Sequence, residues 1–145
     1  MKIVFKNKDG TVGIITPTKE ILRKLTIEHV AKKDVPAGLP WRIVQDHHIP
    51  QDREFRDAWT DDYPTHTIDV HLPKAKEIFM SRVRVKRNEA FIKLGFPHKL
   101  HPELENNLTS ATKKELQKLR DIPQNINLTD VLTVQELKEK WPEGL

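Results

Sequence analysis

The longest helical pattern in the chain runs from Pro73 to Leu94 and stops at Gly95. Proline suits the first turn of a helix, and glycine suits the position just after its end. Apolar residues recur along this run at helical spacing, at Ala75, Ile78, Phe79, Val83, Ala90, Phe91 and Leu94. A helix of this size is about 33 Å long. It predicts that the second half of the chain is built around helices.

Two further helical segments follow this run. Ser110 to Arg120 carries spaced apolar residues and is predicted to end before Pro123. Thr133 to Glu136 reads Thr-Val-Gln-Glu, a capping-box pattern that opens a last short helix ending near Trp141. Residues 73–145 are therefore predicted to form a helical hairpin with a short terminal helix.

The first half has the pattern of a small sheet. Lys2–Lys6 and Thr11–Thr16 are rich in β-formers, and Asp9-Gly10 between them is a strong hairpin signal. Short helices are expected after Thr18 and Thr26, and Trp41–Val44 is expected to add a third strand. We therefore predict an α+β protein with a subdomain over 1–72 and a helical subdomain over 73–145, or one continuous domain.

The segment Ile49–Trp59 is dense in aromatic and charged residues. Asp52 is expected to cap a short helix that places Phe55 and Trp59 on one face and Arg53 and Arg56 on another. These five residues either order the N-terminal core or form a protein contact, since Trp and Arg are favoured at interface hot spots.

Residue types argue against catalysis. The chain has no cysteine, which excludes thiolate metal sites and thiol nucleophiles. Neither serine, Ser81 or Ser110, lies in a Gly-x-Ser-x-Gly elbow, and there is no phosphate-binding loop. The seven histidines are scattered without a fixed-ligand motif, and Asp61–Pro64 is expected to be a turn. We predict no enzyme activity, no cofactor and no metal site.

Positive charge is concentrated in the long helix. Residues 73–95 hold seven basic and two acidic side chains, a net charge of +5 against +4 for the whole chain. Its candidate partner-binding residues are Arg82, Arg84, Lys86 and Arg87, together with Trp141 near the C-terminus. At about 100° per residue these positions spread around much of the helix. A solvated face, an acidic protein partner and nucleic acid all remain open.

No stretch approaches the 18 apolar residues typical of a membrane span, and the N-terminus lacks a signal-peptide core. We therefore expect a protein that neither crosses a membrane nor is exported by a classical signal.

Several motifs together resemble a group of small phage and prophage proteins. They include Ile49-Pro-x-Asp-Arg-x-Phe-Arg-x-Ala-Trp59 and Asp34-Val-Pro-Ala-Gly38. The second half resembles phage tail-fibre assembly chaperones, in which an Arg-rich helix precedes a Leu-Arg-Asp-Ile-Pro segment, here Leu119–Pro123, and a closing Trp141-Pro142. Where those chaperones carry an Asp-Trp pair after the first helix, this chain has Leu94–Pro97.

The resemblance implies a non-enzymatic, phage-encoded factor that binds a phage structural protein. It would serve as a tail or tail-fibre assembly factor or as a small virion component, in the host cytoplasm or the virion. The alternative is a nucleic-acid-binding regulator that uses the basic helix 73–95. The oligomeric state is left open.

Overall fold

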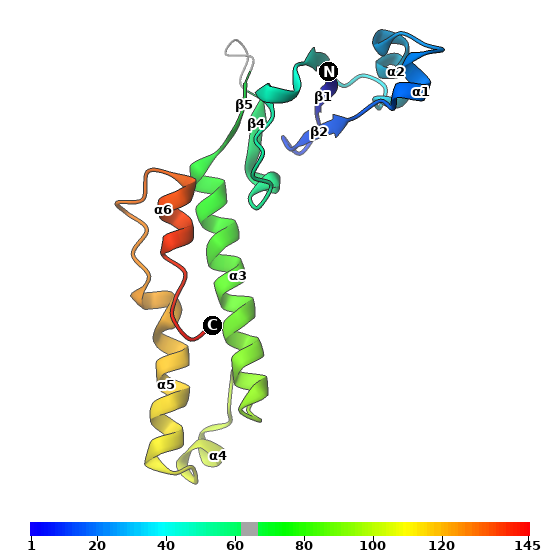
Figure 1. The fold of residues 1–145 in the computed structure, drawn as a ribbon. Coiled ribbons are helices and arrows are strands. Elements are labelled where there is room, and N and C mark those ends of the chain that lie inside the picture. Colours follow the sequence, from blue (N-terminus) through cyan, green and yellow to red (C-terminus); the bar gives the residue numbers. More distant parts are fainter. Residues whose placement is uncertain (62–66) are drawn as a thin grey trace. The chain divides into compact units, whose positions relative to one another are not determined.

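The computed structural model describes residues 1–61 and 67–145, which form two compact units. The units are Met1–His71 and Leu72–Leu145, next to the boundary expected from the sequence. The described strands all belong to the first unit, and the long helices belong to the second (Figure 1). The predicted α+β class, a small antiparallel sheet followed by a helical half, is confirmed.

The first unit is built on a three-stranded antiparallel sheet in the order β2-β1-β3. The strands are β1 (Lys2–Lys6), β2 (Val12–Ile15) and β3 (Trp41–Val44), as predicted. Gly10 closes the β1–β2 hairpin with a φ of +84°, a conformation that glycine adopts without strain.

Helix packing covers one face of this sheet. The helices of this unit are α1 (Lys19–Leu22), which buries no residue, and α2 (Ile27–Asp34); the side chains of Thr18 and Thr26 cap them. Helix α2 buries Ile27, Val30 and Ala31 in a cluster with Ile3 of β1, because alternate strand residues point to opposite faces.

The other face is also covered, which the sequence did not indicate. Val4, Val12 and Val44 pack there against Ile49, Trp59 and Ile68. Trp59 begins β4 (Trp59–Asp61), which pairs antiparallel with β5 (Ile68–Val70). The sheet is therefore buried on both sides. Of the turn expected at Asp61–Pro64, Asp61 is the last residue of β4, and residues 62–64 lie outside the described residues.

The expected helix over Phe55 and Trp59 is wrong. After the short η1 turn (Asp46–His48), the chain forms only one 3-10 turn, η2 (Arg56–Ala58), and Trp59 is already extended, because it pairs with Val70. Asp52 caps no helix; its Oδ1 accepts the backbone N–H of Glu54 at 3.0 Å. Phe55 and Trp59, four positions apart, therefore lie on either side of a 3-10 turn and not on one face of a helix.

The long helix of the second unit is α3 (Leu72–Lys93), which begins one residue before the predicted start. Its end forms a Schellman motif: the N–H of Phe96 bonds the carbonyl of Phe91 at 3.0 Å, and the N–H of Gly95 bonds that of Ile92 at 2.9 Å. Gly95 has a φ of +82°, so the predicted glycine stop is confirmed.

Three more helices complete the second unit, and two of them contact α3: α5 (Ser110–Asn125) and α6 (Val134–Glu139) (Figure 1). The capping box of Thr133 and Glu136 is confirmed. The extra helix α4 (Pro102–Asn106) was not predicted. The predicted end of α5 before Pro123 is wrong, since the helix continues to Asn125. Proline has no backbone N–H, so the helix loses one hydrogen bond at Pro123. Ile122 and Pro123 are half-buried, and this burial offsets the loss.

Candidate functional site

The four candidate basic residues of α3 do not form one strip. Arg82 is half-buried, whereas Arg84 and Lys86 are exposed. Arg82 and Lys86 lie about 40° apart around the helix, but Arg84 is about 200° from Arg82. Lys86 donates a 2.7 Å hydrogen bond to Glu89, which lowers the pKa of the Glu89 carboxyl. The positive charge is therefore divided between two sides and is partly neutralised.

Arg87 lies in the inward-facing row of α3. It is four residues from Val83 and four from Phe91, and both of those side chains are fully buried. Its Nη2 donates to Asn88 Oδ1 at 3.1 Å, while its buried Nε has no hydrogen-bond partner in the described part of the chain. An unpaired buried donor costs about 1–3 kcal/mol. Arg87 is thus partly a packing residue, and charge reversal there would disturb the fold.

Trp141 packs against α3 and keeps an exposed edge. Its ring meets the ring of Phe79 edge to face, with centroids 5.6 Å apart, and the residue is 36% exposed. Its Nε1 donates to the carbonyl of Leu145 at 3.3 Å. This contact orients the segment after α6 and leaves part of the indole available to a partner.

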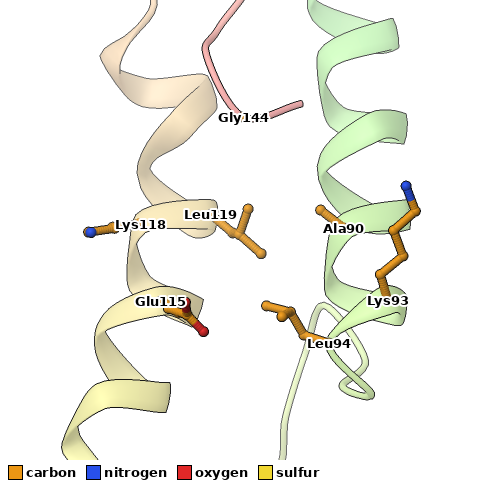
Figure 2. Close-up of a pocket in the computed structure, with 7 residues that line it drawn as sticks. All are labelled: Ala90, Lys93, Leu94, Glu115, Lys118, Leu119 and Gly144. Atoms are coloured by element: carbon orange, nitrogen blue, oxygen red, sulfur yellow. The ribbon is translucent and has the colours of Figure 1, made fainter.

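A groove of about 450 Å³ opens between α3 and α5, with Gly144 beside it (Figure 2). Ala90 of α3 and Leu94, the residue that follows α3, face Leu119 of α5 across it. The charged lining residues are Lys93, Glu115 and Lys118. Figure 2 shows the Lys93 and Lys118 side chains directed away from the gap and the Glu115 carboxylate beside it. The groove thus combines apolar walls with one acidic and two basic lining residues. Sequence reasoning counted its leucines as core residues, and Leu94 is instead 43% exposed.

The predicted motif residues Phe55 and Trp59 lie in the interior of the first unit. The Arg53 guanidinium carbon lies 5.9 Å from the Trp59 ring centroid, within reach of a cation–π contact. Arg56 and Asp52 are exposed. The motif therefore contains buried aromatic anchors and exposed polar residues.

A second hollow, of about 390 Å³, lies in the first unit and is lined by Lys6, Pro40, Trp41, Arg42 and Asp61. Arg42 Nε donates to both Asp61 oxygens at 3.1 Å, and its Nη2 also bonds Asp61. Arg42 and Asp61 are therefore paired with each other, and Lys6 is the third charged residue of the lining. The sequence offered no local signal for it, because the two residues are 19 positions apart.

The histidines within the described residues are not gathered into a metal site. Across residues 1–61 and 67–145, no three His, Asp or Glu side chains lie where they could share a metal ion. His29 instead forms a 2.9 Å hydrogen bond through Nδ1 with the capping hydroxyl of Thr26. His66 lies outside the described residues.

None of the helices in the described ranges combines the length and apolar character needed to cross a bilayer.

Comparisons of the chain with known protein families, with curated proteins and with solved structures found no match.

Proposed function

We propose that this chain is a non-enzymatic, phage-encoded protein-binding factor that acts in tail or tail-fibre assembly or stays in the particle as a small virion component. The observation that supports protein binding is the open apolar groove between α3 and α5. The phage setting rests on the motif resemblance described above.

The groove fits an apolar peptide segment that carries a basic residue. Leu94 and Leu119 offer surfaces for apolar side chains, whose burial drives most protein association. Glu115 lies beside the gap and can pair with a lysine or arginine of the partner. Trp141 adds a partly exposed aromatic residue, a type enriched at interface hot spots.

The test is capture of phage structural proteins by the tagged chain during phage production. Leu94→Lys places a charge in the groove, while a cation near the end of α3 remains compatible with the helix dipole. We expect the wild-type chain to enrich a tail or tail-fibre protein and Leu94→Lys to lose it. Leu132→Lys changes a leucine that is 77% exposed outside the groove, and it should retain capture.

Two results would contradict this proposal. One is equal capture by wild type and Leu94→Lys. The other is recovery of nucleic acid in place of a structural protein, with binding that falls steeply as salt rises, because counterion release governs phosphate contacts. That second result would favour the alternative regulator, whose cations would include Arg82, Lys86 and Lys93 on one side of α3.

A further inference from the structure

The face of α3 opposite its buried residues carries three β-branched apolar residues seven positions apart, Ile78, Val85 and Ile92. We call these three residues the outer row. Val85 is 53% exposed and Ile92 is 71% exposed, while Ile78 is half-buried. Val85 follows the buried Val83 by two positions, about 200° around the helix. The outer row therefore lies away from the side of α3 that buries Val83.

The spacing makes the outer row one continuous stripe. Seven residues fall only about 20° short of two full turns, so successive members stay nearly aligned. Single exposed apolar residues are normal, but a seven-residue repeat of β-branched residues is typical of the a positions of two-stranded parallel coiled coils. Ser81 and Asn88 then occupy the d positions, so the apolar part of the stripe consists of the outer row at the a positions.

The charges that flank the outer row identify the partner. Counted from the same repeat, Glu77 and Arg84 are at g positions, and Arg82 and Glu89 are at e positions. In a parallel pair each g residue lies beside the e residue five positions further along the partner helix. Glu77 then meets Arg82 of the second copy, and Arg84 meets Glu89. Both pairs have opposite charges, and two-fold symmetry repeats each of them.

The carboxylate of Glu89 can take part in this pairing while it keeps its own contact. Its Oε2 accepts from Lys86 within the same helix, and a carboxylate has a second oxygen for Arg84 of the other copy. An antiparallel pair centred on Val85 would instead bring Arg84 near Arg84 of the other copy, and only Arg82 and Glu89 would then meet with opposite charges. The charge pattern thus favours the parallel arrangement.

We propose that α3 is a dimerisation helix, on which a second copy of this chain docks in parallel and in register along the outer row. This surface is distinct from the groove, because Ala90 of the groove and Ile92 of the outer row are about 200° apart on the helix. Dimerisation is measured on the purified chain alone, so its outcome is independent of any phage partner.

Sedimentation equilibrium of the purified full chain tests the proposal directly. Wild type should show a concentration-dependent monomer–dimer equilibrium. Val85→Glu/Ile92→Glu should be monomeric, with an unchanged circular dichroism spectrum, because both residues are already largely exposed. A wild-type chain that stays monomeric up to about 1 mM, the weak end of specific affinity, would overturn the proposal. So would a dimer that persists in the double variant.

Charge exchange tests the parallel register. Arg84→Glu places like charges together twice in each dimer and should weaken Kd at least about tenfold. Glu89→Arg should do the same, and Arg84→Glu/Glu89→Arg should return Kd to within about threefold of wild type. Both residues are exposed, so the variants should fold. Failure of the exchanged variant to recover would contradict the proposed pairing.

A disulfide provides a second readout, because the chain contains no cysteine. Asn88→Cys places one thiol at a d position, where a parallel in-register pair brings the two thiols within bonding distance. It should form a covalent dimer in a glutathione redox buffer. Gln117→Cys, on the exposed side of α5, should not. Equal cross-linking of both variants would contradict the register.

Discussion

At the residue scale, Gly13 is required by its cross-strand neighbour. Gly13 pairs with Phe5 across the β1–β2 hairpin, and the Phe5 ring occupies the space that a side chain at position 13 would need. A Cβ at that position would overlap the ring atoms, so either the ring or the strand would have to move. Glycine is otherwise unfavourable inside a strand.

We therefore expect Gly13→Ala to lower the free energy of unfolding by about 1–3 kcal/mol, the usual cost of overpacking. Chemical denaturation of wild type and variant measures this difference. The matched control is the same substitution in a Phe5→Leu background, where the smaller side chain should reduce the cost. An equal loss in both backgrounds would mean that the ring is not the cause.

At the scale of elements, the pair Arg42 and Asp61 joins β3 to β4. The two side chains are only 17% and 13% exposed, and Arg42 binds the carboxylate in a bidentate manner. Bidentate charge-assisted hydrogen bonds are geometrically specific, so the pair fixes how the β4–β5 hairpin meets the sheet.

Removing one member of this pair should cost more than removing both. Arg42→Met is expected to lower the free energy of unfolding by about 2–3 kcal/mol, because it leaves a partly buried carboxylate without its cation. Arg42→Met/Asp61→Leu should recover about half of that loss, since no unpaired charge remains. Urea unfolding of the two variants gives both values, and a larger loss in the double variant would contradict this account.

Helix α4 is tied to α5 by a hydrogen bond from Arg120 to Glu105, which lowers the pKa of the Glu105 carboxyl below its usual value. A carboxyl whose pKa is lowered by folding stabilises the fold above its unfolded pKa, about 4.3 for glutamate. This stabilisation is lost as the pH falls through the folded-state pKa.

Glu105→Gln should therefore lower Tm at pH 7, and its Tm should converge with that of wild type at about pH 2, where both side chains are neutral. Thermal unfolding across this range, followed by circular dichroism, measures the difference. Glu103→Gln removes a carboxylate from α4 while it keeps the Arg120 hydrogen bond, and it serves as the control. A Tm difference that is constant with pH would contradict the assignment.

Elements with local signals could be predicted from the sequence, and elements that depend on distant contacts could not. The Asp9-Gly10 hairpin, the threonine caps and the Gly95 stop are decided within a few residues. Trp59, by contrast, joins a strand only because Val70 pairs with it. Helix α5 passes Pro123 where burial outweighs local preference.

The candidate site could be predicted only in part, because it also depends on contacts between residues that are distant in the sequence. The residues of α3 were identified from charge, but their orientation depends on which side packs against α5 and α6. That packing turns Arg87 inward and leaves Arg84 exposed. The groove brings Leu94, just after the end of α3, next to Leu119 of α5, and their positions in the sequence do not indicate that they meet.

At the scale of the whole molecule, the two units differ in the features they contain. The unit Met1–His71 holds the motif with the buried Phe55 and Trp59, and the unit Leu72–Leu145 holds the groove and the outer row. The net charge of the segment 73–95 exceeds that of the whole chain. Both proposed binding surfaces, the groove and the outer row, belong to this helical unit.

The proposed function requires that this chain bind a phage structural protein during assembly. Electron microscopy and infectivity of particles made from a phage genome with an early stop codon in this gene test it most directly. We expect missing or defective tails or tail fibres, restored by wild-type protein supplied in trans and not by Leu94→Lys. Normal, fully infectious particles at normal yield without the protein would contradict the claim.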